Sequence, residues 1–394
     1  MQAFCNSQPG WVYSAAMAEP KRIAIVHDWL TTMRGGEKVL EAICGLFPNA
    51  DLYTLIHRKG STSPTIEGMP IHTSFIQHLP FAGRIHRYYL PLFPAAMERF
   101  ELADYDLVIS SHHCVAKGVR TPPETLHICY CHTPMRYLWT LYDEYFGEGK
   151  AGFITRLGVQ MFLGYLRRWD VRTAQCPKHF VANSGHVRRR IREIYHRESE
   201  VVHPPVDVGS FVPSHVNDRY YLVAGALVPY KRVDLAVEAF NRTGERLVIA
   251  GEGPDLIRLK RTAKQNIEFV GWQTDAQLRV LYSGCRVLVF PGEEDFGIVP
   301  LEAMASGKPV IAFGKGGALE TVVDGVTGLL FANQSVDSLL DAIRRCSSRD
   351  FEPEVLRKHA LKFDRSVFLE RFGHLVHQWW EEFSSERQTS RHPR

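Results

Sequence analysis

Two glutamates that follow an apolar segment have the residue type and spacing of a ligand site. The run Val287–Phe290 reads as a buried strand, and a helical pattern begins near Pro300 and stops at Gly307. Glu294 lies in the intervening loop, and Glu302 lies on the helix among apolar neighbours. Ligands bind at the carboxyl ends of parallel strands, and a helix amino terminus favours an anion. The pair therefore indicates a ligand site, although most such pairs are a solvated loop and a helix surface.

A pair of glycines, Gly35 and Gly36, is a second candidate site. It lies between the apolar stretch Lys21–Asp28, which reads as a buried parallel strand, and a helical pattern over Val39–Phe47. Backbone N–H groups can approach an anion closely where no Cβ intervenes, so this order of elements suits phosphate. A lone glycine pair is more often an ordinary turn, and both interpretations stay open.

Strand-like and helical segments alternate through both halves of the chain, which at 394 residues is long enough for two domains. Such alternation favours an α/β architecture with doubly wound sheets. The predicted strands are 21–28, 52–56, 107–111, 126–130 and 180–184 in the first half, and 221–224, 247–250, 267–270, 287–290, 310–313 and 328–331 in the second.

The segment around the two glutamates resembles the signature of retaining glycosyltransferases of family 4, which have the GT-B fold. The resemblance rests on the spacing of the glutamates, on Phe296-Gly297 between them and on Glu302-Ala303-Met304-Ala305. It covers roughly residues 20–380 and is strongest over 221–331. It implies two Rossmann-like domains that face each other across a cleft.

The same resemblance implies how a nucleotide sugar is bound. Glu294 is expected to contact the hydroxyls of the donor sugar and Glu302 the ribose, since a carboxylate can accept hydrogen bonds from two vicinal hydroxyls. Gly35 and Gly36 are expected to face the diphosphate across the cleft. The other expected donor-site residues are Gly271 beside the nucleotide and the backbone of Phe296, Gly297, Ile298 and Val299 around the sugar.

Basic residues are expected at the diphosphate because cleavage of the sugar–phosphate bond leaves an extra negative charge on the departing nucleotide. The family usually has an arginine where Ala226 stands and a lysine five residues on. Lys231 matches the lysine, and Arg232 is a candidate to replace the arginine. His132 corresponds to the family's histidine that reaches the reacting sugar, although a histidine at such a position is usually a turn residue. The predicted catalytic residues are therefore His132 and Glu294.

No metal or redox cofactor is expected. The eight cysteines include no C-x-x-C, and Cys129, Cys131 and His132 are too close together and too few for a zinc site. The D-x-D sequence Asp104-Tyr105-Asp106 precedes a predicted strand instead of ending one, so we predict a solvated turn there. No G-x-G-x-x-G opens a helix, which argues against NAD.

The amino-terminal half has features that could serve an anionic or membrane partner. Through Pro205 the chain has 23 Lys+Arg and 18 Asp+Glu, and such a small excess could also be chance. Basic and aromatic residues gather between Phe75 and Phe100. Such segments can lie in a membrane interface, and packing on the chain's own domain is an equal alternative. Related transferases use this region for lipid-linked acceptors. The basic group Arg188, Arg189, Arg190 and Arg192 is predicted to be a solvated helix face.

The chain shows no targeting or membrane-spanning pattern. No run approaches the length of a membrane span, and residues 1–16 lack a basic region followed by an apolar core. We therefore expect a cytoplasmic protein, with the inner face of the cell membrane as an alternative, and Met17 as an alternative start. No nucleic-acid partner is expected.

The resemblance also predicts the boundaries of the domains along the chain. It implies a stiff, proline-containing linker over Val201–Asp207 and terminal helices that cross back to the first domain. The predicted segments are a disordered extension (1–18), an acceptor-side domain (19–205), a nucleotide-sugar domain (206–365), carboxyl-terminal helices (366–386) and a disordered tail (387–394).

Three segments, 227–234, 293–300 and 317–321, resemble bacterial mannosyltransferases that build O-antigen or exopolysaccharide repeats from GDP-mannose. The predicted function is transfer of a hexose, with mannose from GDP-mannose implied, to a saccharide or polyprenyl-linked oligosaccharide with retention at the anomeric carbon. Two other classes stay open. A glycoside hydrolase also uses a carboxylate pair, and a non-catalytic protein could bind a sugar nucleotide.

Overall fold

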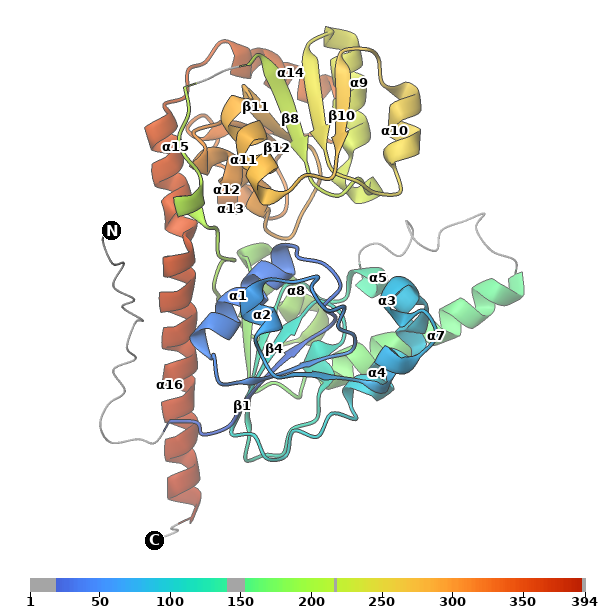
Figure 1. Cartoon of the computed structure of the whole chain (residues 1–394), viewed down its shortest axis with the longest axis vertical. Helices are drawn as coiled ribbons and strands as arrows, with labels where there is room; N and C mark the ends of the chain where they lie inside the picture. The colour runs from blue at the N-terminus through green and yellow to red at the C-terminus, as the bar shows by residue number, and fades with distance from the viewer. Residues whose placement is uncertain (1–18, 140–152, 216–217, 392–394) are drawn as a thin grey trace.

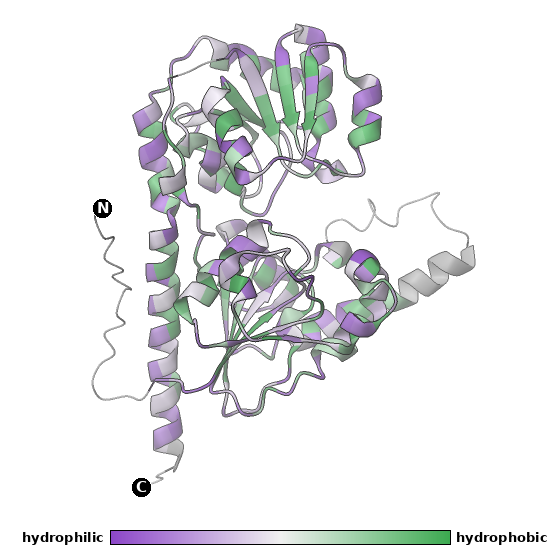
Figure 2. Cartoon of the chain, viewed as in Figure 1, coloured by the Kyte–Doolittle hydropathy of each residue, from purple (hydrophilic) through white to green (hydrophobic). Residues whose placement is uncertain are grey.

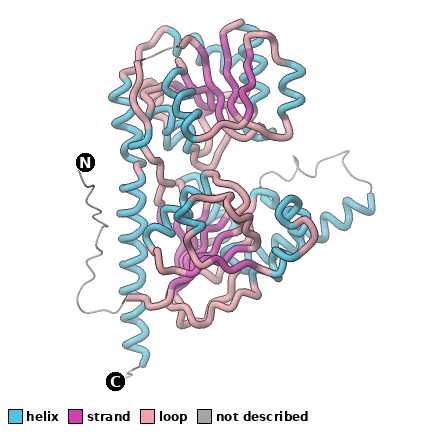
Figure 3. The backbone as a smooth tube through the Cα atoms, in the orientation of Figure 1, coloured by secondary structure: helices cyan, strands magenta, loops and turns pink. Residues whose placement is uncertain are grey.

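The computed structural model describes residues 19–139, 153–215 and 218–391. They form two α/β domains, one above the other in Figure 1, with α16 along one side. Figure 3 shows the strands of each sheet inside and the helices outside. The predicted class of two doubly wound Rossmann-like domains is confirmed. The predicted extension, residues 1–18, lies outside the described residues.

The first domain is built on a parallel sheet with strand order β3-β2-β1-β4-β5-β6-β7. Every residue of β4 and β5 is buried, as expected for central strands with helices on both faces. The strands are β1 Ile23–His27, β2 Asp51–Thr54, β3 Ile71–Thr73, β4 Leu107–His112, β5 Leu126–Cys131, β6 His179–Ala182 and β7 Glu200–Val201. The helices are α1 Gly35–Leu46, α2 Pro64–Glu67, η1 Phe75–His78, α3 Ala82–Ile85, η2 His86–Leu92, α4 Phe93–Met97, η3 Ala116–Gly118, α5 Arg136–Trp139, α7 Phe153–Thr173 and α8 Gly185–Tyr195.

The second domain has a parallel sheet with strand order β10-β9-β8-β11-β12-β13. Its strands are β8 Tyr220–Ala224, β9 Arg246–Ala250, β10 Ile267–Gly271, β11 Val287–Phe290, β12 Val310–Phe313 and β13 Gly328–Phe331. Its helices are η4 Val208–Ser210, η5 Pro229–Lys231, α9 Val233–Thr243, α10 Leu256–Thr262, α11 Asp275–Gly284, α12 Ile298–Ala305, α13 Ala318–Thr321, α14 Val336–Ser347, α15 Pro353–Ala360 and η6 Leu361–Phe363.

All the predicted strands are present, with ends that differ by about two residues. Two short strands were not predicted: β3, and β7, which lies at the start of the predicted linker. Both are too short to show an alternating or apolar pattern. The Phe75–Phe100 region folds as short helices packed partly into the first domain.

Each sheet has one point at which the direction of strand succession reverses. In the first domain this point lies between β1 and β4, and in the second between β8 and β11. Ligands of open α/β sheets bind in the crevice at such points, beyond the carboxyl ends of the strands. Gly35-Gly36 follows β1, Lys231 follows β8 and Glu294 follows β11, so the fold places the predicted donor residues at the two crevices.

The carboxyl-terminal segment is one long helix, α16 (Arg365–Arg391). The prediction of several helices followed by a disordered tail from residue 387 is therefore wrong for residues 387–391. The apolar side chains of α16 lie at helical spacing and pack into the core of the first domain, which holds the helix against that domain. They are Phe368, Phe372, Val376, Trp379, Trp380 and Phe383.

None of the helices in the described part of the chain is both long enough and apolar enough to cross a bilayer.

Candidate functional site

Glu302 lies at the junction of the two domains. Its carboxylate accepts hydrogen bonds from Lys38 Nζ on α1 (3.1 Å) and from the Tyr282 hydroxyl on α11 (2.9 Å). Lys38 belongs to the first domain and Glu302 to the second, so this ion pair joins the two domains. Burial lowers the pKa of Lys38, but the nearby carboxylates of Glu302, Asp275 and Asp207 together outweigh burial, and the pKa is raised. The sequence analysis missed Lys38, whose only signal is its position just after the glycine pair.

Glu294 pairs with Lys231 within the second domain. Lys231 Nζ lies 2.8 Å from Glu294 Oε1, and both side chains are largely buried. Burial would lower the pKa of Lys231, and the neighbouring carboxylate raises it above its ordinary value. The structure thus brings together two residues that the sequence predicted for the donor site from separate loops.

The glycine pair packs against predicted residues of both domains. A Cβ on Gly35 would lie 3.2 Å from Ile298 Cδ1 of the second domain, and a Cβ on Gly36 would lie 3.9 Å from the His132 ring. The amino terminus of α1 is therefore next to the start of α12 and to His132. The N–H groups of its first turn lack intrahelical acceptors, and with the helix dipole they suit an anion at this place.

His132 is held by polar neighbours of the first domain. Its Nε2 is 2.9 Å from Ser111 Oγ, and Ser111 Oγ is 3.0 Å from His27 Nδ1. Burial, with the nearby His113 and His27, keeps the pKa of His132 well below its ordinary value. The ring is therefore neutral near pH 7 and can position a substrate hydroxyl.

The predicted sugar-binding loop, Phe296 to Val299, forms the entry to α12. Gly297 has φ +91°, and a Cβ there would meet the Phe290 ring at 3.2 Å, so only glycine fits without strain. The Phe296 ring stacks on His203 of the linker between the domains, with ring centroids 5.2 Å apart. The linker thus supports the loop that is expected to hold the sugar.

Gly271 and Arg232 lie in the same domain but differ in environment. The carbonyl of Gly271 accepts a hydrogen bond from the N–H of Gly251 (2.7 Å), which joins the turns after β10 and β9. The Arg232 guanidinium is engaged by Asp234 (3.1 Å) and Gln334 (3.3 Å). Arg232 is thus turned toward its own domain, and its predicted contact with a diphosphate stays a prediction.

A second set of inter-domain contacts surrounds Asp295, which the sequence analysis did not single out. Arg136 donates from Nε (2.9 Å) and from Nη2 to Asp295 Oδ2, and Arg190 Nη1 donates to Asp295 Oδ1 (2.8 Å). Ser184 Oγ donates to the Asp295 carbonyl (2.6 Å). The prediction that Arg190 lies on a solvated face is wrong, because α8 turns it toward Thr133 and Asp295.

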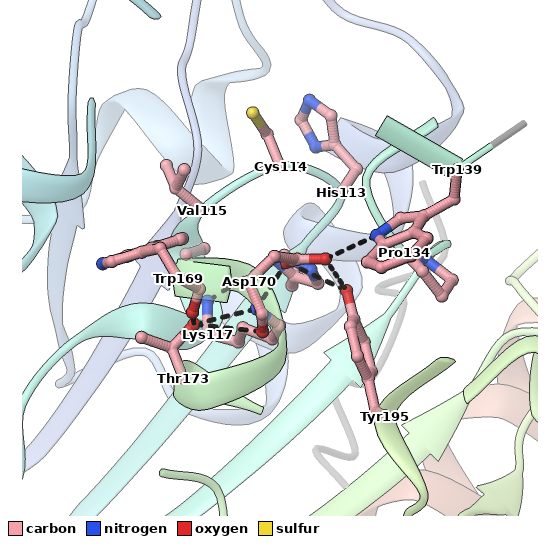
Figure 4. Close-up of polar contacts among 12 residues, drawn as sticks. His113, Cys114, Val115, Lys117, Pro134, Trp139, Trp169, Asp170, Thr173 and Tyr195 are labelled. Carbon is pink, nitrogen blue, oxygen red and sulfur yellow. Dashed lines mark hydrogen bonds and ion pairs between the residues drawn. The ribbon is translucent and has the colours of Figure 1, made fainter. Parts of the chain in front are cut away.

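Figure 4 shows a buried polar cluster that anchors the elements around α5. Lys117 Nζ donates to Asp170 Oδ1 (2.7 Å) and Thr173 Oγ1 (3.0 Å), and both charged side chains are fully buried. Asp170 Oδ2 accepts from Trp139 Nε1 (2.8 Å) and the Tyr195 hydroxyl (3.0 Å). Because Trp139 ends α5 and Arg136 begins it, this cluster fixes the helix that carries Arg136.

No cluster of three or more His, Cys, Asp or Glu among the described residues could hold a metal ion. Asp106 accepts from the backbone N–H of Lys21 and Arg22, and Asp104 pairs with Arg22, so the D-x-D sequence serves as a turn. Within the described chain every cysteine is a free thiol.

The second domain of this chain matches a known family of proteins. Residues 211–363 match the family model Glycosyl transferases group 1. The chain is 29% identical over 189 residues to the D-inositol 3-phosphate glycosyltransferase of Mycobacterium avium (strain 104), a match that covers 41% of this chain and 45% of that one. It is 28% identical over 220 residues to the protein of the same name from Mycobacterium tuberculosis (strain ATCC 25177 / H37Ra), covering 50% and 44%. The chain thus spans less than half the length of these relatives.

Solved structures resemble the whole described fold. The sucrose-phosphate synthase of Thermosynechococcus elongatus has a TM-score of 0.68 against this chain. It is 18% identical, and the match covers 92% of this chain and 100% of that one. Anabaena Alr3699/HepE in complex with UDP has a TM-score of 0.65 with 17% identity over 90% and 99%. These likenesses, together with the two parallel sheets, confirm the predicted GT-B fold.

Proposed function

We propose that the protein is a glycosyltransferase that transfers a hexose from a nucleoside diphosphate sugar, with GDP-mannose as the first donor to test. The match of residues 211–363 and the fold support sugar-nucleotide chemistry. One observation carries the proposal: each predicted glutamate pairs with a lysine, Glu294 with Lys231 within the second domain and Glu302 with Lys38 of the first domain. Carboxylates for hydroxyls and cations for phosphates are the groups that such a donor needs.

In this proposal each side chain takes one part of the donor. Lys231 and the N–H groups at Gly35 and Gly36 bind the phosphates, and Glu302 binds the ribose. Glu294 and the Phe296–Val299 backbone bind the sugar. Neutral His132 lies on the face where the sugar reacts.

We further propose that the reaction retains the anomeric configuration. The acceptor hydroxyl attacks on the face from which the diphosphate leaves, and the departing phosphate oxygen takes the acceptor proton. Lys231 and the helix dipole of α1 stabilise the charge that develops on the leaving group. No metal ion is used in this scheme.

The test is donor turnover by Glu294→Gln and Glu302→Gln with a panel of GDP-mannose, UDP-glucose and UDP-galactose. Each variant keeps its shape but loses charge-assisted hydrogen bonds, so kcat/KM for the donor should fall on the order of 100-fold. Glu293→Gln is the matched control, because Glu293 is the exposed neighbour of Glu294 and should leave turnover unchanged. Full turnover in both site variants would end the assignment.

The same assay separates the alternatives. A glycoside hydrolase would release sugar from an oligosaccharide without any nucleotide. A sugar-nucleotide-binding protein would bind GDP tightly and transfer nothing to any acceptor.

We also propose that the acceptor is a saccharide on a polyprenyl carrier and that the first domain touches the membrane surface that holds it. The supporting feature is a surface at α3 and η2, where Phe81 and Tyr88 are 73% and 82% exposed. Arg84 and Arg87 are exposed beside them. Figure 2 shows hydrophobic and hydrophilic residues interleaved on these short helices. Aromatic and basic residues together suit the boundary between lipid headgroups and acyl chains.

A further inference from the structure

Three basic side chains near the predicted diphosphate position each form an ion pair with a carboxylate. Lys231 is paired with Glu294, Lys38 with Glu302, and Arg232 with Asp234. A diphosphate is anionic before transfer and gains charge as the sugar leaves, so a single lysine is a weak complement. The question is which other cation the fold brings to Lys231.

Arg136 is that cation, and it comes from the first domain. Its guanidinium carbon lies 4.9 Å from the centroid of the Tyr230 ring, and its Nε lies 2.9 Å from Asp295 Oδ2. Tyr230 immediately precedes Lys231 in one loop, and Asp295 immediately follows Glu294 in the other. The guanidinium is therefore bracketed by the chain neighbours of both members of the Lys231–Glu294 pair.

The electrostatic couplings agree with this placement. Burial would lower the pKa of Arg136, and Asp295, Tyr230 and Glu294 together raise it, so the side chain stays charged. The positive charge of Arg136 in turn acts to lower the pKa of Lys231, as expected for a neighbouring like charge. Two cations held near each other are stabilised by an anion placed between them.

Asp295 is shared between Arg136 and a second arginine. Arg190 Nη1 lies 2.8 Å from Asp295 Oδ1 and is also bonded to Thr133. One carboxylate thus serves two guanidinium groups at the junction of the domains.

Contacts between α5 and α7 also fix the position of Arg136. The backbone carbonyl of Leu138 accepts from Arg167 Nε (3.1 Å) and Nη2 (2.8 Å), and Trp139 donates to the buried Asp170 (Figure 4). A four-residue helix has little stability of its own, so these contacts are what hold it. They fix Arg136 at the junction of the domains.

We propose that Arg136 is a donor-site residue that neutralises the diphosphate of the sugar nucleotide from the first domain, with Asp295 and Tyr230 orienting its guanidinium. This inference rests on the proposed function, because it takes the ligand to be a nucleoside diphosphate. Since Lys231 lies on the second domain and Arg136 on the first, the phosphate site is complete only when the domains are together. Leaving-group stabilisation is then tied to domain closure.

The test compares binding of a nucleoside diphosphate and the matching monophosphate, GDP with GMP and UDP with UMP, by calorimetry. In Arg136→Gln the loss of charge-assisted hydrogen bonds should weaken diphosphate binding about 10- to 100-fold. Monophosphate binding should change less than about threefold, so the diphosphate preference falls. Arg136→Lys keeps the charge without the planar fork and should recover part of that preference.

Arg190→Gln is the matched control, because it breaks the other arm of the same Asp295 contact. A purely structural clamp predicts that both arginine variants lower diphosphate and monophosphate affinity alike, and that result would overturn the inference. If the wild-type protein binds diphosphates well and Arg136→Gln keeps the full preference, only the role of Arg136 fails. If the wild-type protein binds neither nucleotide, the proposed function fails with it.

Discussion

At the scale of single residues, the first domain buries several titratable groups. His27, Asp28, His112 and Lys117 are fully buried, and His127 is nearly so. Asp28 accepts hydrogen bonds from successive backbone N–H groups after β4 and from His113, which makes it a cap for that turn. Buried neutral histidines, by contrast, oppose protonation of the folded state. The stability of this domain should therefore depend on pH.

His127 gives the clearest prediction of that dependence. Burial lowers its pKa to about 3, against an ordinary value of 6.5. As the pH falls below 6.5 the unfolded chain takes up a proton that the folded chain refuses, so the free energy of unfolding decreases. The loss amounts to about 1.4 kcal/mol for each pH unit until the folded value is approached.

Urea unfolding of wild type and His127→Gln between pH 7.5 and 5 tests this. The variant should show a shallower decline in stability as the pH falls. His78→Gln replaces an exposed histidine and should leave the slope unchanged. An identical slope for His127→Gln and wild type would contradict the prediction.

At the scale of elements, the buried Lys117–Asp170 pair joins segments that lie far apart in the sequence. It connects η3 with α7, and through Trp139 and Tyr195 it reaches α5 and α8. Both charges have their partners, which offsets the cost of removing them from water. Removal of one partner would leave the other charge buried and uncompensated.

Lys117→Met should accordingly lower the free energy of unfolding by about 3–5 kcal/mol. The double variant Lys117→Met with Asp170→Asn should recover part of this loss, because no buried charge is left unpaired. Chemical denaturation followed by circular dichroism measures both.

Lys178→Met is the control for this measurement. Lys178 pairs with Glu386 at the surface, where an ion pair contributes about 0–1 kcal/mol. A loss for Lys117→Met no larger than that of the control would show that the buried pair contributes little.

At the scale of the whole molecule, ion pairs and one long helix join the two domains. Asp295 and Glu320 of the second domain both contact α8 of the first, Glu320 through the backbone N–H of Gly185 (2.9 Å) and His186 (3.0 Å). α16 leaves the second domain and packs along the first. In Figure 1, α3 lies on the side of the first domain that faces away from α16.

The membrane proposal belongs to this scale. Phe81→Asn and Tyr88→Ser should each weaken binding to anionic phospholipid vesicles on the order of 10-fold, because each removes a large apolar side chain. Asparagine suits residue 81 because its backbone is left-handed, with φ 52°. Flotation with vesicles gives the bound fraction.

Ile257→Ser serves as the matched control, since Ile257 is 75% exposed on the second domain. Equal losses in all three variants would show that the α3 and η2 surface is not the membrane contact. Absence of vesicle binding by the wild-type protein would remove the membrane proposal altogether.

The sequence by itself determined the order of strands and helices and the loops that carry the predicted donor residues. Apolar runs such as Val287–Phe290, bounded by glycine and proline, are local signals and predicted the central strands of both sheets. The spacing of Glu294 and Glu302 is equally local. Strands as short as β3 and β7 carry too few residues for such a signal.

Only the tertiary structure decided which charged side chains meet. Arg136 and Asp295 are 159 residues apart in sequence, and Lys38 and Glu302 are 264 apart. Periodicity records which face of an element is buried, but it does not record which buried face lies opposite another domain. For the same reason Arg190 looked like part of a solvated basic group, and packing of the two domains buried it against Asp295.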